Sequence, residues 1–213
     1  MMLIGIDTCG AVGTVALARW KEGAVSLVAQ AELAGKTYSA ELVPKIQELL
    51  EAEGLGPRDL EAVVVTRGPG SFTGVRIGVS SAKAFAEALE IPLLGVSRLA
   101  VLAYKARTDA AILDAGRGEF YVGTRAGEAL FLPEEVRRQL DGSLAVCEEK
   151  TAQAFPEAML VDPPSAADAL IFAAPRLLAK DFDDVATIDG NYLRRSDAEL
   201  FARRPVPATN GKE

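Results

Sequence analysis

A glycine-rich segment at 67–78 has the residue types of a phosphate-binding loop. Its sequence, RGPGSFTGVRIG, holds four glycines and follows the apolar run 62–65. Glycine permits positive φ angles and lets the backbone approach a ligand closely. The amides from Ser71 to Val75, at the start of an expected helix, could form an anion-binding nest, to which Arg76 would add charge. The candidate nucleotide-binding residues of this segment are therefore Gly68, Gly70, Ser71, Thr73 and Gly74.

The segment matches neither of two common phosphate-loop patterns. Gly74 is followed by Val75, where the P-loop pattern requires lysine. The dinucleotide-binding pattern needs its third glycine one residue before Gly74. The alternative interpretation is a strained turn packed against a partner lobe, with Ser71 or Thr73 only capping the helix.

A second candidate site lies at the end of the first apolar segment, where Asp7 is followed by Thr8 and Gly10. These three residues are similar to the first phosphate loop of actin-like ATPases, in which the aspartate helps to hold a metal–nucleotide complex. They complete the set of candidate nucleotide-binding residues. The alternative is that Asp7 caps a turn. Asp114 follows a later apolar segment in the same way, and there a turn role is favoured.

The composition excludes several classes of site. The chain of 213 residues has no histidine, which removes histidine-ligated metals and nucleophile–histidine pairs, and we expect no metal site. A net charge of −7 disfavours a stand-alone nucleic-acid binder. Cys9 and Cys147 form no paired motif, and the apolar runs are too short to span a membrane. We therefore expect a cytoplasmic protein without disulfides.

The elements around these residues follow a recognisable order. Strands are predicted at 2–7, 14–20, 24–33, 62–66 and 91–96, and helices at 38–54, 75–89 and 98–106. The order βββαβαβα, with an aspartate ending the first strand, is that of one half of ribonuclease-H-like and actin-like folds.

The second half begins in the same way. The segment 110–131 repeats the strand–turn pattern around Asp114, which indicates a diverged internal duplication. Weaker predictions follow, with helices at 133–140 and 165–180 and strands at 143–147 and 158–161. We therefore predict an α/β protein with the two-lobed actin-like (ASKHA) fold, whose second ribonuclease-H-like half is degenerate. The expected lobes are 1–106 and 107–213, the latter ending in a frayed tail.

Two predicted helices carry more apolar surface than one packing face needs. Helix 75–89 has a stripe of small residues and a second apolar line through Ile77, Phe85 and Leu89. Helix 38–54 is apolar on a similarly wide face. The predicted partner-binding residues are Leu42, Ile46, Gly78, Ala82, Phe85 and Ala86. The alternative is that the second lobe covers this surface.

The arginine pairs near the C-terminus are the remaining candidate contact. They are Arg194, Arg195, Arg203 and Arg204. They could touch RNA, although a solvated surface is the favoured interpretation.

The segment 68–78, GPGSFTGVRIG, resembles the signature of the TsaB (YeaZ) family, bacterial proteins required for the threonylcarbamoyladenosine modification of tRNA. The resemblance extends to LIGIDTCGAVGTVAL, YSAELVPKIQELL, GVSRLAVLA, ILDAGRGEFY and GNYLRR, and so covers nearly the whole chain. The sequence departs from the family pattern at Tyr38, where histidine is usual, and at Gly116, where arginine is usual.

The resemblance implies an actin-like accessory subunit without transferase activity of its own. Such proteins bind the catalytic paralogue TsaD, which holds a metal through a His-x-x-x-His helix, by the helices of the first lobe. They form homodimers through the same helices when alone, work with the ATPase TsaE, and meet tRNA only through the complex. The resemblance implies no required cofactor, and leaves weak ATP or ADP binding open. The alternatives from the residues are an actin-like ATPase or small-molecule kinase and, less favoured, a peptidase.

Overall fold

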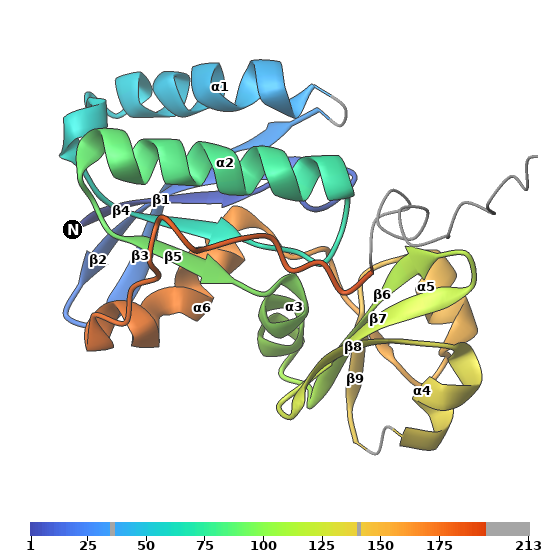
Figure 1. The fold of residues 1–213 in the computed structure, drawn as a ribbon. Coiled ribbons are helices and arrows are strands. Elements are labelled where there is room, and N and C mark those ends of the chain that lie inside the picture. Colours follow the sequence, from blue (N-terminus) through green and yellow to red (C-terminus); the bar gives the residue numbers. More distant parts are fainter. Residues whose placement is uncertain (35–36, 140–141, 195–213) are drawn as a thin grey trace, which may run out of the picture.

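The computed structural model describes residues 1–34, 37–139 and 142–194, which form two mixed sheets with helices on both faces of each (Figure 1). The first sheet has the strand order β3-β2-β1-β4-β5. Its strands are β1 (Met2–Asp7), β2 (Gly13–Lys21), β3 (Ala24–Leu33), β4 (Leu60–Thr66) and β5 (Leu93–Val96). The central strand β1 is buried along its whole length, since it pairs antiparallel with β2 and parallel with β4.

Helices cover both faces of this sheet because side chains alternate along β1. Ile4 and Ile6 face α1 (Tyr38–Ala52) and α2 (Phe72–Leu89), whereas Leu3 faces α6 (Ala166–Ala179). A short 3₁₀ helix, η1 (Pro57–Asp59), precedes β4. None of the described helices is long and apolar enough to cross a membrane.

The second sheet repeats the topology of the first. Its strands are β6 (Ala110–Gly116), β7 (Glu119–Thr124), β8 (Gly127–Phe131), β9 (Leu144–Val146) and β10 (Met159–Leu160). Their order, β8-β7-β6-β9-β10, corresponds strand for strand to β3-β2-β1-β4-β5. Helix α3 (Arg98–Ala106) packs on one face, and α4 (Pro133–Gln139) and α5 (Glu149–Ala154) on the other. The duplicated, two-lobed actin-like fold predicted from the sequence is confirmed.

The third helix of each half packs on the sheet of the other half. Helix α3 contacts β6, β7 and β9, and α6 contacts β1, β2 and β4. The close approach of α6 depends on Gly5, where a β-carbon would lie 2.9 Å from Cγ of Leu170. The spatial layers therefore differ from the expected lobes 1–106 and 107–213 at these two helices, because their apolar faces complete the core of the opposite half.

Two local details differ from the sequence prediction. Helix α2 begins at Phe72 rather than near residue 75 because Ser71 caps it. Helix α5 was not predicted, since six residues are too few for a clear 3.6-residue periodicity. Pro44 lies inside α1 without ending the helix. The expected tail, 203–213, lies outside the described residues.

Candidate functional site

The glycine-rich loop joins β4 to α2 and is fixed by hydrogen bonds within the protein. The Ser71 hydroxyl accepts from the amide of Gly74 at 3.2 Å, and the Ser71 carbonyl accepts from the amide of Val75 at 2.8 Å. The amide of Ser71 donates to the carbonyl of Cys9 at 2.8 Å. Three of the five amides expected to form an anion-binding nest therefore already have acceptors in the protein. Nucleotide binding through this loop stays a prediction.

The glycines of this segment allow α2 to pack closely on the end of β1. A β-carbon at Gly74 would overlap the carbonyl oxygen of Thr8, and one at Gly78 would overlap the hydroxyl of Thr8. A β-carbon at Gly70 would overlap the carbonyl of Cys9. The Thr8 hydroxyl donates to the carbonyl of Gly74 at 2.6 Å, and this hydrogen bond joins the end of β1 to the first turn of α2. These glycines are thus explained by packing, although on the end of β1 in the same lobe and not on a partner lobe, as the alternative interpretation had it.

Asp7 ends β1 and faces Arg98, the first residue of α3. Nε of Arg98 lies 3.9 Å from Oδ2 of Asp7, and both residues are buried. Burial raises the pKa of Asp7, and the positive charge of Arg98 opposes this shift. The guanidinium fits because position 10 is glycine, where a β-carbon would lie 2.7 Å from Nη2 of Arg98. A cation of the protein therefore stands beside the carboxylate that we expected to hold a metal–nucleotide complex.

Two of the residues around Asp7 were not predicted from the sequence. Arg98 lies in a segment whose pattern indicates only an apolar helix. The signal that could have identified it is its charge, since it is the one charged residue in the first turns of that helix, directly after the cap Ser97. Tyr38 marks a departure from the family pattern, and its hydroxyl donates to the carbonyl of Gly10 at 2.9 Å. Tyr38 thus holds the turn that follows β1.

Asp114 occupies the equivalent position in the second half, at the end of β6. Its Oδ1 accepts from the amide of Gly116 at 2.7 Å, and its Oδ2 lies 3.1 Å from Nζ of Lys150. Partial burial works to raise the pKa of Asp114, but the Gly116 amide and Lys150 outweigh it, so the pKa is lowered. The turn role favoured for Asp114 agrees with this geometry.

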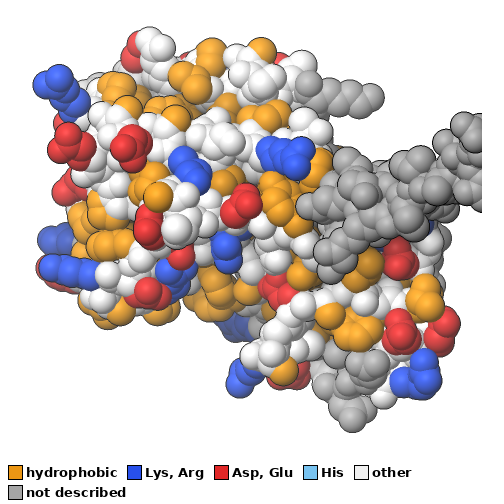
Figure 2. Space-filling view, viewed as in Figure 1, with side chains coloured by type: hydrophobic (Ala, Val, Ile, Leu, Met, Phe, Trp, Pro, Cys, Tyr) orange, Lys and Arg blue, Asp and Glu red, His pale blue; other side chains and the backbone are white. Residues whose placement is uncertain are grey.

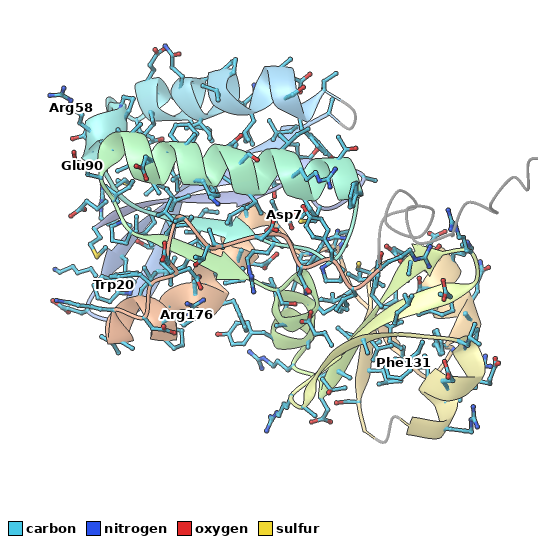
Figure 3. All side chains as sticks on the ribbon, viewed as in Figure 1. Asp7, Trp20, Arg58, Glu90, Phe131 and Arg176 are labelled. Carbon is cyan, nitrogen blue, oxygen red and sulfur yellow. The ribbon has the colours of Figure 1, made fainter. Side chains whose placement is uncertain are left out.

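A cavity of about 420 Å³ separates the two aspartate turns. Its lining includes Gly10, Ser71, Arg98, Asp114 and Glu148. Figure 3 shows Asp7 at the end of the first sheet that is nearest the second lobe. Three candidate nucleotide-binding residues of the two segments, Gly10, Gly70 and Ser71, therefore line this cavity, whereas Asp7 and the other candidates do not.

The groups at this cavity are poorly suited to nucleophilic chemistry. Burial raises the pKa of the Cys9 thiol well above its usual range, and burial raises the pKa of Cys147 to about 11. Both remain thiols at neutral pH. Among the residues that the structure describes, no group of three or more Asp, Glu or Cys side chains could hold a metal ion.

Five of the six predicted partner-binding residues are not on the surface. Leu42, Ile46, Gly78, Ala82 and Ala86 are buried between the two helices and the first sheet. Phe85 packs against the same core and is only partly buried. The prediction was wrong for the five because the small-residue stripe faces the sheet, where Gly78 permits the contact with Thr8 described above.

The outward face of α2 carries a different row of residues. Thr73, Ser80 and Ala84 are exposed and follow one another at helical spacing. Val43 of α1, in the same helical layer, is 51% exposed. Figure 2 shows hydrophobic and uncharged surface over the upper part of this layer, with Lys and Arg side chains at the level of α2. We refer to Val43, Thr73, Ser80 and Ala84 as the outer helix face.

The C-terminal arginine cluster is only partly described. Arg194 donates to the carbonyl of Gly116 at 3.1 Å and pairs with Glu119. It therefore has a role within the second lobe, close to the turn of Asp114. Arg195, Arg203 and Arg204 lie outside the described residues.

Comparison with known proteins identifies related sequences. Residues 29–186 match the family model described as TsaD: tRNA N6-adenosine threonylcarbamoyltransferase. The TsaB protein of Escherichia coli K12, a tRNA threonylcarbamoyladenosine biosynthesis protein, is 39% identical over 128 residues, which are 57% of this chain and 53% of that protein. The Bacillus subtilis TsaB is 37% identical over 127 residues, which are 58% and 54% of the two chains. This chain spans about half the length of the curated relatives that it matches.

A solved structure is similar to this protein over nearly the whole fold. YeaZ from Pseudomonas aeruginosa superimposes with a TM-score of 0.73 at 26% identity, covering 90% of this chain and 99% of that one. The two duplicated sheets and the aspartate-ended first strands place the protein in the actin-like class. Within that class the chain belongs to the TsaD-related family, in its TsaB (YeaZ) group.

Proposed function

We propose that this protein acts in the biosynthesis of threonylcarbamoyladenosine in tRNA, as an accessory subunit without transferase activity. The observation that carries the proposal is the match to TsaB proteins, at 37–39% identity, on a fold with the same architecture as YeaZ. The absence of histidine supports the accessory role, because the chain cannot build the His-x-x-x-His metal helix that the resemblance implies for TsaD.

The docking surface for a TsaD-like paralogue is the outer helix face. Its four side chains are small or uncharged, which suits close approach of a partner helix, and the exposed Arg76, between Thr73 and Ser80 on the same stripe, would need a carboxylate of the partner. The same surface would serve a homodimer when the protein is alone. The buried residues Leu42, Ile46, Gly78, Ala82 and Ala86 contribute indirectly, because they hold α1 and α2 on the sheet.

The assembly would also include a TsaE-like ATPase, with tRNA held mainly by the catalytic partner. The net charge of −7 supports an indirect tRNA contact. We propose no required cofactor for this chain, and a cytoplasmic location.

The test is reconstitution. This protein, co-expressed with the TsaD paralogue of its own genome, should co-purify with it in a defined stoichiometry. Threonylcarbamoyladenosine formation on tRNA should then depend on adding this chain to TsaD and TsaE. Full modification in its absence, with the other components pure, would contradict the proposal.

An actin-like nucleotide-binding protein or ATPase is the second candidate. The cavity lined by Gly10, Ser71 and Asp114 favours it, because nucleotides bind between the lobes of that class. The Arg98 side chain argues against it, since it takes up the space beside Asp7. Turnover of ATP by the purified chain that is lost in Asp7→Ala would support this candidate over the accessory role.

A further inference from the structure

The exposed side of α2 carries a cation near its start and an anion near its end. Arg76 and Glu87 are both exposed, and Ser80 and Ala84 lie between them on the same side of the helix, at spacings of four, four and three residues. Figure 1 shows α2 running over the first sheet from the side of the second lobe to the opposite corner, where Figure 3 labels Glu90. We refer to Arg76, Ser80, Ala84 and Glu87 as the α2 stripe.

The Arg76 side chain is held in place without being neutralised. Its guanidinium carbon lies 3.7 Å from the centroid of the Phe72 ring and 5.7 Å from that of the Tyr192 ring. Stacking on aromatic faces orients an arginine and leaves its N–H groups free to donate. Arg76 does not line the cavity between the aspartate turns, so its charge does not belong to the candidate nucleotide site.

The Glu87 carboxylate is also left without a countercharge. Lys83, one turn earlier on α2, is directed elsewhere, because its Nζ donates to the carbonyls of Ala186 and Ile188 at 3.2 and 3.1 Å. In the part of the chain that the structure describes, neither Arg76 nor Glu87 forms a side-chain hydrogen bond or an ion pair. Both charges are therefore available to another molecule.

The order of these charges does not stabilise α2 itself. A helix is stabilised by acidic side chains in its first turn and by basic side chains in its last turn. Helix α6 follows this rule, with Asp168 in its first turn and Arg176 in its last. Helix α2 has no acidic residue in its first turn and no basic residue in its last turn, where Glu87 lies. The order of charges therefore indicates a role outside the helix.

We propose that α2 pairs antiparallel with α2 of a second copy of this chain, through reciprocal ion pairs between Arg76 and Glu87. A two-fold axis beside the middle of the helix places the start of each helix on the end of the other, so a cation meets an anion at both ends. Ser80 and Ala84 lie at the crossing, where small side chains let two helices approach closely. The inference deepens the proposed function and rests on it, because it takes the outer helix face to be a docking surface.

The α2 stripe selects this occupant by its charges. From start to end it carries a cation, two small residues and an anion, which is complementary to the same stripe in the reverse direction. A parallel pair would bring Arg76 to Arg76 and Glu87 to Glu87, and like charges across an interface oppose association. A nucleic acid or an anionic membrane would attract Arg76 but repel Glu87, on a protein whose net charge is −7. The antiparallel second copy gives both charges a partner.

The test is charge reversal in the full chain, with self-association measured by sedimentation equilibrium. Arg76→Glu leaves two anions on each stripe and Glu87→Arg leaves two cations, so each single variant should weaken the dimer about ten-fold or more. The double variant Arg76→Glu, Glu87→Arg again has opposite charges at its two ends and should dimerise with native affinity. The matched controls, Arg125→Glu and Glu157→Arg, reverse exposed charges of the second lobe and should leave the dimer unchanged.

A mixture of the two single variants tests the orientation of the pair. In a mixed dimer the two anions of one copy face the two cations of the other, so Arg76→Glu and Glu87→Arg should dimerise together although each fails alone. Native mass spectrometry identifies the mixed dimer, because the two chains differ in mass. Circular dichroism verifies that every variant is folded.

Three results would overturn the inference. They are a native chain that stays monomeric at the highest concentration measured, native affinity in either folded single variant, and a double variant that dimerises no better than the single ones. The experiment contains no TsaD-like paralogue, so the two proposals fail separately. A monomeric chain that co-purifies with the paralogue contradicts only the self-pairing, whereas a dimer with the expected charge dependence that does not bind the paralogue contradicts only the proposed function.

Discussion

Asp7 and Asp114 make the same turn at the ends of equivalent strands, and each faces a different cation. Oδ1 of Asp7 accepts from the amide two residues later at 2.8 Å, and Oδ1 of Asp114 does the same at 2.7 Å. Arg98 stands beside the first carboxylate and is buried, whereas Lys150 stands beside the second and is 81% exposed. The duplication has thus kept the turn, while burial has made the electrostatics of the two halves unlike.

Replacing Arg98 by methionine should destabilise the protein strongly at neutral pH. The Asp7 carboxylate would be left buried without its countercharge, which typically costs about 3–5 kcal/mol. The pKa of Asp7 is already raised, so the folded protein holds this proton more tightly than the unfolded chain does, and loss of Arg98 would raise the pKa further. Arg98→Met should therefore recover stability, relative to the native protein, as the pH falls from 7 to 5. Urea denaturation at both pH values measures the free energy of unfolding of the variant and of the native protein.

The control for Arg98→Met is the double variant with Asp7→Asn. Removing the carboxylate charge as well should restore part of the lost stability at pH 7 and abolish the recovery at pH 5. If the single and double variants were equally unstable at both pH values, the loss would come from packing around Arg98, and the electrostatic explanation would be wrong.

The Asp114 pair should give the opposite pH dependence and a small effect. The pKa of Asp114 is lowered, so its contribution to stability is present above the unfolded pKa and is lost as the pH falls through the folded pKa. Asp114→Asn should lower the melting temperature at pH 7, and its difference from the native protein should shrink as the pH falls below 3.8, the ordinary pKa of the carboxyl. The loss should be less than about 1 kcal/mol, because Lys150 is largely exposed and solvent screens the pair. A difference in melting temperature that persists unchanged near pH 3 would rule out this explanation.

A substitution in the glycine-rich segment tests directly whether its glycines are required for the packing of α2 on the end of β1. Gly74→Ala should destabilise the protein by several kcal/mol, since the added methyl group meets the backbone of Thr8 and α2 cannot move away without losing its contacts with β1. Gly56→Ala is the matched control, because its φ is −119° and a β-carbon there would lie 3.8 Å from Oδ2 of Asp59. Chemical denaturation compares the free energies of unfolding of the two variants. Near-native stability of Gly74→Ala would mean that this glycine is not kept for packing.

The fold is well predicted by the sequence because the signals that define it are local. Each strand of the first sheet is an apolar run between turns, and Asp7 and Asp114 mark the repeated strand ends, so the amino-acid pattern alone reveals the duplication. Helix periodicity also locates α1 and α2. The exchange of α3 and α6 between the sheets does not follow from the pattern, because amphipathicity says that a helix packs but not on which sheet.

The candidate site is predicted in part, for a related reason. Spacing identifies the glycine-rich loop and Asp7, and the fold brings them together. The orientation of α2 does not follow from spacing, since small residues suit both a close contact with the sheet and a close contact with a partner. Ala82 and Ala86 were therefore assigned to the wrong face, and Arg98 was missed because its partner is distant in sequence.

The two faces of α2 offer a final test, which uses neighbouring alanines. Ala84→Arg adds an exposed side chain to the outer helix face, so the free energy of unfolding should change by no more than about 0.5 kcal/mol. Ala82→Arg places a charge in the core, where Ala82 is fully buried, and should unfold the protein. If the outer helix face docks the TsaD-like paralogue, Ala84→Arg should weaken co-purification and homodimer formation about ten-fold or more while the protein stays folded. Binding is measured by titration calorimetry and dimerisation by sedimentation. Native affinity in a folded Ala84→Arg variant would move the interface away from α2.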